Sequence, residues 1–328
     1  MSYRLPNPKS LLGLLALGVL AGGALGMWNR WHTVRGSSHW IVLAPRESES
    51  APPLQEDPPK CRQWLQQAQQ RLRRMPALAA RIRIRAKMFG RRMLGTGRYW
   101  QAPAPGEKKP FLQTRFQWAL QQGSQAVHWQ QVCDGRFLWT MTRYPHKRRL
   151  TRVDLAEVMP EVARMPPSSA AAAELQVPYG LAGWLQQLQQ SCRFTHWQPA
   201  RIQSVPMLAL YGTWRPETLA PLVKDPQGLF AGPLPMDSDL LPAHLPQQVV
   251  VYLSRKELFP FRIDFRRGRG EEEKIQVVLE FFQLQVSPQV DPALFTYRPG
   301  RLRVQDETQR VLGRLRRASR RAEDETRR

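Results

Sequence analysis

The sequence predicts an α+β protein with a large curved antiparallel β-sheet, helices on the concave side of that sheet, and an N-terminal transmembrane or signal helix. Residues 78–155 alternate apolar and polar side chains in runs that Gly, Pro and Asp-Gly turns separate. This pattern is typical of consecutive antiparallel strands with one wet face. Residues 61–74 and 180–191 are amphipathic and predict helices whose apolar stripes need a partner. Residues 10–28 are apolar and carry no charge.

The apolar run at residues 10–28 fits either a membrane anchor or a secretory signal peptide. Basic residues flank it on both sides, so the positive-inside rule orients it only weakly. Ala24 and Gly26 are small residues of the kind that precede a signal-peptidase cut. We favour an uncleaved anchor, with the bulk of the chain exported, over cleavage after Gly26.

Changes in composition, and clusters of proline, serine and charged residues, divide the chain into five segments. These are a basic N-terminal segment (1–9), the anchor or signal peptide (10–28), a Pro/Ser-rich linker (29–60), a β domain (61–300) and an Arg-rich charged tail (301–328). The tail has a weak helical stripe. It is expected to be a frayed helix, a helix that needs a partner, or disordered.

Within the meander we expect five or six strands. The first alternates Ile82 and Ile84 with arginines such as Arg83, so one face is apolar and the other cationic. The Gly-Thr-Gly fragment at residues 95–97 is expected to break the chain between two strands. The turn at Cys133-Asp134-Gly135 leads into a later strand.

After the second helix the sequence predicts five more strands and two irregular regions. The strands lie around residues 194–197, 207–214, 249–253, 259–266 and 275–286. Residues 160–178 and 216–246 are rich in proline and predict loops, with a short helix at best in the second. Asp291 followed by Pro292 predicts a capped helical turn.

The formal net charge of +23 limits the class of partner. It comes from 49 Lys and Arg against 26 Asp and Glu. Such an excess suits nucleic acid or an anionic membrane surface. A nucleic-acid binder usually concentrates its charge on one element, whereas the arginines here occupy polar strand faces and both chain ends. We therefore favour a solvated or membrane-attracted surface over nucleic-acid binding.

No catalytic or metal-binding motif is present. The six histidines form no His-x-x-x-His pair, and the sequence has neither a Gly-x-Ser-x-Gly elbow nor a Walker loop. Cys61, Cys133 and Cys192 lack the spacing of zinc or redox sites. A Cys61–Cys192 bridge and three buried free thiols both remain open. We expect a protein that is not an enzyme and uses no metal or cofactor.

Aromatic residues are abundant on the predicted strand faces. Two helices can cover a sheet of this length only if it curls around them. A curled sheet whose open side is covered by helices can enclose an apolar cavity for lipid or acyl chains. A core filled by the protein's own side chains is an equally weighted alternative.

The order helix, meander, covering helix and final strands resembles the LolA/LolB superfamily of lipoprotein carriers over residues 61–308. The resemblance is carried by GTGRYW at 95–100, VCDGRFLW at 132–139, RVDL at 152–155, FPFRI at 259–263 and VDPALF at 290–295. It implies an incomplete β-barrel in the periplasm, with a helical lid over a cavity for acyl chains. By the same analogy the cavity-lining residues are Phe116, Trp118, Trp129, Trp139 and Phe261.

Two features depart from a soluble shuttle. The anchor would prevent diffusion between membranes, and the basic surface and tail are unlike a carrier. We therefore expect a cell-envelope protein whose periplasmic domain is tethered to the inner membrane, or released if the signal is cleaved, and which binds lipid or acylated lipoprotein. The alternative is a structural or interaction protein of the envelope, with a filled core and a basic tail that recruits acidic partners. The sequence leaves the ligand and the oligomeric state open.

Overall fold

A computed structural model describes most of the chain from residue 53 onward. The described residues are 53–75, 77–88, 91–104, 112–122, 125–165, 179–216, 218, 245–268, 274–286 and 289–326. The predicted anchor at residues 10–28 lies outside them, as do most of the linker and most of the two proline-rich regions. None of the helices in the described ranges is long and apolar enough to cross a membrane.

One 13-stranded sheet forms the body of the molecule. In spatial order its strands are β1 (Gln55–Glu56), β8 (Cys192–Ile202), β9 (Val205–Trp214), β10 (Gln248–Ser254), β11 (Pro260–Arg267), β12 (Lys274–Val286), β2 (Leu78–Met88), β3 (Arg91–Pro103), β4 (Leu112–Gln122), β5 (Gln125–Cys133), β6 (Phe137–Arg143), β7 (Arg148–Asp154) and β13 (Val304–Asp306). Neighbours are antiparallel except β13, which runs parallel to β7. The sheet is open, because β1 and β13 form its two ends. The predicted meander is confirmed as strands β2 to β7.

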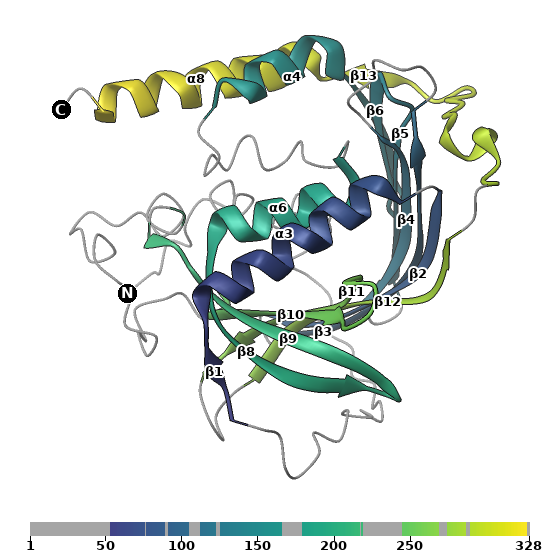
Figure 1. The fold of residues 1–328 in the computed structure, drawn as a ribbon. Coiled ribbons are helices and arrows are strands. Elements are labelled where there is room, and N and C mark those ends of the chain that lie inside the picture. The colour runs from purple at the N-terminus through teal and green to yellow at the C-terminus, as the bar shows by residue number, and fades with distance from the viewer. Residues whose placement is uncertain are drawn as a thin grey trace, which may run out of the picture.

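The sheet curves around two of the four α-helices that the described residues form (Figure 1). Helices α3 (Pro58–Arg74) and α6 (Gly180–Ser191) lie against each other on the concave face. Their apolar sides join the inward side chains of nine strands, β2 to β5 and β8 to β12, in the main hydrophobic core. Asp57 starts α3 by accepting a hydrogen bond from the backbone N–H of Lys60 at 3.0 Å. The predicted helical cover of the concave face is confirmed.

A second pair of helices covers the inner face at the other end of the sheet. Helix α4 (Leu155–Ala163) starts directly after β7, where the Asp154 side chain accepts a hydrogen bond from the Ala156 N–H at 2.9 Å. The sequence prediction missed this helix, because Pro160 lies inside it and was interpreted as the start of a loop. Proline removes one helical hydrogen bond, and burial of residues such as Leu155 and Val158 offsets that loss.

Much of the Arg-rich tail is folded onto this end of the sheet. Strand β13 pairs with β7, and helix α8 (Thr308–Thr326) packs beside α4 (Figure 1). Val311, Leu312 and Leu315 of α8 are buried with the apolar side of α4 in a second core. The partner that the tail helix needs is therefore a segment of the same chain.

Two smaller predictions have different outcomes. The capped turn at Asp291 is confirmed as the 3-10 helix η3 (Pro292–Phe295), with the Asp291 side chain accepting from the Ala293 N–H at 2.9 Å. The break at residues 95–97 was wrong, because β3 runs through it. A Cβ atom on Gly97 would lie 2.3 Å from the carbonyl oxygen of Gln117 on β4. The glycine therefore allows close approach of two paired strands.

We predict that Gly97→Ala destabilises the fold by about 2 kcal/mol or more, because the added methyl group displaces β4. Urea unfolding measures the change in free energy. Gly313→Ala in α8 is the matched control. Its Cβ would meet only an arginine side chain at 3.5 Å, so alanine should stabilise the helix by about 0.5–1 kcal/mol. Equal effects of the two substitutions would contradict this account of Gly97.

The junction between β13 and α8 should weaken in acid. Hydrogen bonds from Thr308 and Arg152 lower the pKa of Asp306 to about 2. A carboxylate whose pKa is lower in the folded state stabilises it above its ordinary pKa, and that contribution is lost as the pH falls from about 4 towards 2. Hydrogen exchange in α8 should therefore accelerate over this range. Asp306→Asn should remove that pH dependence, while Asp291→Asn should leave it in place.

Candidate functional site

A continuous layer of aromatic rings lies between the concave face of the sheet and helix α6. This aromatic layer consists of Tyr99, Phe116, Trp118, Trp129, Trp184, Phe259, Phe261 and Phe281. Neighbouring ring centroids are 5.0 to 6.3 Å apart, in edge-on or tilted arrangements. These distances are typical of favourable aromatic pairs. The layer is part of the main hydrophobic core that the sheet and the helices share.

Strand register brings the layer together. Phe116 and Trp118 are two residues apart on β4 and so face the same side. Trp129 of β5 is directly opposite Trp118. The Trp184 side chain of α6 packs against Phe116, with 5.6 Å between the ring centroids. The helix therefore closes the layer from above.

Four of the five residues predicted to line a cavity belong to the layer: Phe116, Trp118, Trp129 and Phe261. Trp139 does not. It lies on the opposite face of the sheet and stacks on Tyr297, with centroids 5.4 Å apart. Cys133 pairs with Leu138 across the β5–β6 turn, so inward residues are odd-numbered on β5 and even-numbered on β6.

The predicted set left out Tyr99, Trp184, Phe259 and Phe281. Helical spacing within residues 180–191 places Trp184 on the apolar side of that helix, together with Leu181 and Leu185. Strand alternation offered a similar signal for Phe281, opposite Ile82 in the register of β12 and β2. The sequence alone does not show that these rings lie close together, because they come from segments far apart in the chain.

A buried glutamine connects both covering helices to the sheet. Gln101 of β3 accepts hydrogen bonds from the Tyr99 hydroxyl at 2.7 Å and from the Leu181 N–H of α6 at 3.5 Å. Its amide nitrogen donates to the Leu72 carbonyl of α3 at 3.5 Å. Gly180 has φ +59, and a Cβ there would lie 2.7 Å from the Gln101 side-chain oxygen, so glycine is required. We call these contacts the Gln101 latch.

The two helices are also linked to each other by side chains. The amide of Gln69 on α3 donates to the Gln189 side chain of α6 at 2.8 Å. Arg73 of α3 donates to the Gln186 side chain at 2.7 Å. These contacts favour movement of α3 and α6 as one body, with the Gln101 latch as a polar connection to the sheet.

Several polar atoms are buried on the inner side of the sheet without a hydrogen-bond partner in the described part of the molecule. They include the indole nitrogens of Trp118 and Trp184 and the side-chain oxygen of Gln131. Leaving a buried polar group unpaired costs roughly 1–3 kcal/mol. Most buried polar groups in proteins are paired, so these atoms are candidates for contact with the polar end of a ligand.

The three cysteines are free and buried. The open question between a Cys61–Cys192 bridge and free thiols is thus resolved in favour of free thiols. Burial raises the pKa of Cys61 to about 11 and that of Cys133 to about 12. Burial also raises the pKa of Cys192. The thiols are protonated at neutral pH and unreactive while the core is closed.

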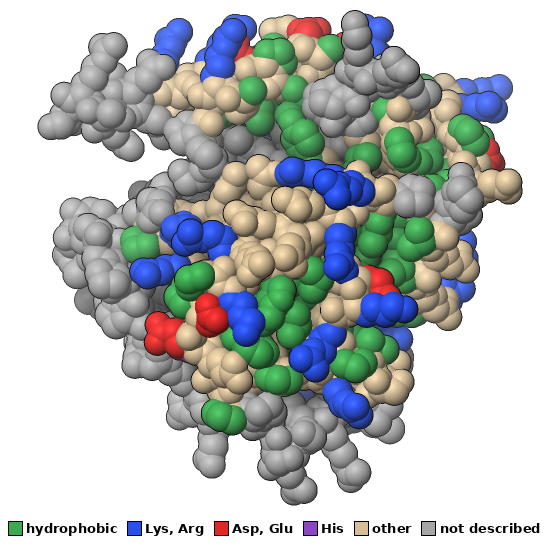
Figure 2. Space-filling view, in the orientation of Figure 1, with side chains coloured by type: hydrophobic (Ala, Val, Ile, Leu, Met, Phe, Trp, Pro, Cys, Tyr) green, Lys and Arg blue, Asp and Glu red, His purple; other side chains and the backbone are tan. Residues whose placement is uncertain are grey.

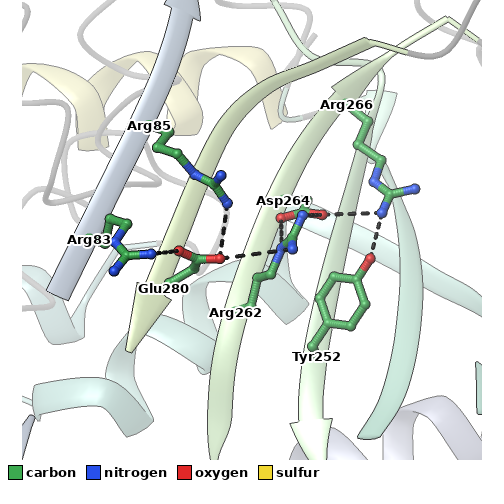
Figure 3. Close-up of polar contacts among 7 residues, drawn as sticks. All are labelled: Arg83, Arg85, Tyr252, Arg262, Asp264, Arg266 and Glu280. Carbon is green, nitrogen blue, oxygen red and sulfur yellow. Dashed lines mark hydrogen bonds and ion pairs between the residues drawn. The ribbon is translucent and has the colours of Figure 1, made fainter. Parts of the chain in front are cut away.

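The opposite face of the sheet contains a buried charge network (Figure 3). Asp264 is fully buried and accepts two hydrogen bonds from Arg262, at 2.6 and 2.9 Å, and one from Arg266 at 3.1 Å. Arg266 also donates to the Tyr252 hydroxyl. Burial by itself lowers the pKa of Arg262, but the hydrogen bond and charge of Asp264 raise it above its ordinary value. Glu280 of β12 lies 3.9 Å from the Arg262 guanidinium, so the network links β10, β11 and β12.

Two other kinds of site, a metal site and a concentrated basic patch, find little support among the described residues. No group of three or more His, Cys, Asp or Glu side chains among them is arranged to hold a metal ion. Basic side chains are dispersed over the face seen in Figure 2, between hydrophobic and uncharged ones. The aromatic layer therefore remains the candidate site.

No protein-family model matches the sequence, and no protein of curated function is significantly similar to it. Similar solved structures include Mycobacterium tuberculosis lipoprotein LppX, with 12% identity, TM-score 0.36 and coverage of 71% of this chain and 99% of LppX. A chain of the Pseudomonas aeruginosa MucA/MucB complex has 11% identity and TM-score 0.35, covering 72% of this chain and 60% of that one. A Vibrio parahaemolyticus domain described as an outer membrane lipoprotein-sorting protein has 10% identity and TM-score 0.28, covering 72% and 97%.

The chain spans less than two thirds of the matched MucA/MucB chain. Every one of these TM-scores is below 0.5. We therefore base the proposals below on this chain's own residues.

The buried charge network leads to a stability prediction. Asp264→Asn leaves two arginines without their shared carboxylate and should cost about 3 kcal/mol. Glu280→Gln is the matched control. Its side chain is 19% exposed and can be hydrated after the change, so it should cost less than about 1 kcal/mol. Urea unfolding of both variants checks the prediction, and a near-neutral Asp264→Asn would contradict it.

Proposed function

We propose that this protein is a non-catalytic component of the cell envelope that binds an acyl chain of a lipid or lipoprotein against the aromatic layer. The observation that carries the proposal is the layer itself. Eight rings form one apolar surface, and an open curved sheet presents it to a linked pair of helices. The resemblance to the LolA/LolB superfamily implies the same class of ligand.

The rings contact one another and α6, so an acyl chain enters only when α3 and α6 move away from the sheet. Each buried methylene contributes roughly 0.8 kcal/mol, and a 16-carbon chain therefore contributes on the order of 10 kcal/mol before any cost. Helices α3 and α6 thus act as a lid over the aromatic layer. Loss of the Gln101 latch should make it easier for this lid to open.

The unpaired indole nitrogens indicate how the polar end of the ligand is held. Trp118 and Trp184 each have a buried N–H that needs an acceptor. An ester or carboxyl oxygen of an acylated molecule supplies one. The same ligand that replaces apolar helix contacts would thus also satisfy these donors.

Location and tethering are further parts of the proposal. The apolar run at residues 10–28 supports export, with an uncleaved inner-membrane anchor favoured over a cleaved signal peptide. The lipid-binding domain would then lie in the periplasm. Tethering would confine lipid or lipoprotein transfer to partners that reach the same membrane.

A second candidate function is an interaction protein of the envelope with a permanently closed core. The mutual contacts of the rings favour it, as do the exposed arginines of α8, including Arg310, Arg317 and Arg320. In that case the basic helix would recruit an acidic partner and the aromatic layer would be structural. Ligand uptake separates the two functions.

Binding of a fluorescent long-chain fatty acid to the delipidated full-length protein should be saturable. Trp118→Leu should weaken it about tenfold, because both ring contact and the indole donor are lost. Trp118→Phe keeps a ring and tests the donor alone. Trp139→Leu is the matched control and should bind normally, since Trp139 faces the other side of the sheet. Circular dichroism verifies folding. A folded wild-type protein without saturable uptake supports the closed-core function instead.

Opening of the lid has its own readout in Cys61, which lies fully buried on the inner side of α3. In a protein with Cys133→Ala and Cys192→Ala, thiol labelling should be slow without ligand and faster while fatty acid exchanges. Gln101→Leu should accelerate both labelling and uptake. Unchanged labelling during demonstrated uptake would exclude entry beneath α3 and α6.

A further inference from the structure

The convex face of strands β2, β3 and β4 is strongly basic. We call it the cationic face. Its outward-facing basic residues are Arg81, Arg83, Arg85, Lys87, Arg92, Arg98 and Arg115. Among the described residues of these three strands, no outward-facing position holds Asp or Glu. Arg81, Arg83, Lys87, Arg92 and Arg98 are exposed, and the other two are half-buried.

Basic residues on this face are directly opposite one another. Arg81 pairs with Arg98 across β2 and β3, and Lys87 pairs with Arg92. Like charges in directly opposite positions destabilise a sheet. Glu280 of β12 forms ion pairs with Arg83 and Arg85, with nitrogen–oxygen distances of 3.7 and 3.0 Å. Within the described ranges no carboxylate lies within 4.0 Å of Arg81 or Arg98, so an external anion would relieve this repulsion.

Apolar groups are interspersed with the charges. Leu94 is 47% exposed between the basic positions. The guanidinium of Arg115 lies 6.0 Å from the ring centroid of Trp100, and that of Arg83 lies 5.2 Å from the centroid of Phe282. A mixture of arginine, tryptophan and leucine on one surface is typical of proteins that rest at the interface of a bilayer.

The geometry favours a bilayer over nucleic acid. Single-stranded nucleic acids bind in basic grooves with open aromatic faces on which bases stack. Here the face is the convex side of a curved sheet (Figure 1), and arginines lie over the rings of Trp100 and Phe282. An arginine therefore already lies over one face of each ring.

We propose that the cationic face docks on the surface of an anionic lipid bilayer. Arginine and lysine contact the phosphates, and Leu94 reaches the boundary between headgroups and acyl chains. The face is on the opposite side of the sheet from the aromatic layer. Bilayer docking therefore does not depend on acyl-chain binding, and either can fail while the other holds.

Arginine footprinting of the full-length protein locates the contact. Vesicles of phosphatidylcholine, with or without one third phosphatidylglycerol, are added before phenylglyoxal, and mass spectrometry measures modification of each arginine. A tethered chain attaches to both kinds of vesicle, so only the anionic lipid effect counts. Arg81, Arg92 and Arg98 should be protected on anionic vesicles alone, and protection should disappear at high salt.

Two double variants with the same change in charge give the decisive comparison. In Arg81→Gln/Arg98→Gln the anionic lipid concentration that half-protects Arg92 should rise roughly thirtyfold, given the usual contribution of each basic residue near a charged membrane. Arg301→Gln/Arg303→Gln, both exposed, should leave it unchanged.

Three outcomes would overturn the proposal. They are equal protection on both kinds of vesicle, an equal effect of the two double variants, and protection by duplex DNA at a lower phosphate concentration than by anionic vesicles. Because Arg81→Gln/Arg98→Gln removes a repulsive pair, its thermal midpoint should not fall, so misfolding would not obscure the result.

Discussion

Burial of one apolar sheet face beneath α3 and α6 is the interaction on which the rest of the structure depends. The two-residue period of each strand sends alternate side chains to that face. Ile82 and Ile84 face the helices, and their neighbours Arg81 and Arg83 face outward. The sheet curves around the helices, and this brings rings from β3, β4, β5, β11 and β12 into one layer. A flat sheet would leave the outer members of the layer in water.

The same alternation determines the chemistry of the other face. Every inward apolar residue requires an outward neighbour, and this chain fills many outward positions with arginine. Near β11 the charges are buried, and Asp264 accepts hydrogen bonds from both arginines. On β2 to β4 most of them are exposed, and within the described residues most have no neighbouring carboxylate. The sheet thus separates an apolar side suited to acyl chains from a cationic side suited to an anionic surface.

Local patterns were enough to predict strands β2 to β12, helices α3 and α6 and the capped turn at Asp291, because alternation, helical spacing and capping act between residues close in the chain. They did not predict β1 and β13, the very short strands in the expected linker and tail. They were not enough to place Trp139, since its face depends on the register across the β5–β6 turn, and a shift of one residue reverses every side chain. Helix α8 was uncertain for another reason. Its partner α4 lies about 150 residues earlier, and no local pattern contains that contact.

The central claim is that an acyl chain binds between the aromatic layer and the helices α3 and α6. Photo-crosslinking in membranes that contain the full-length protein tests it most directly. A fatty acid with a diazirine near its terminal carbon is added, and cross-linked residues are mapped by mass spectrometry. The account predicts adducts at inner residues such as Tyr99, Phe116 and Trp184, which excess unlabelled fatty acid prevents. Adducts restricted to residues 10–28 and the cationic face would contradict it and would favour an interaction protein with a closed core.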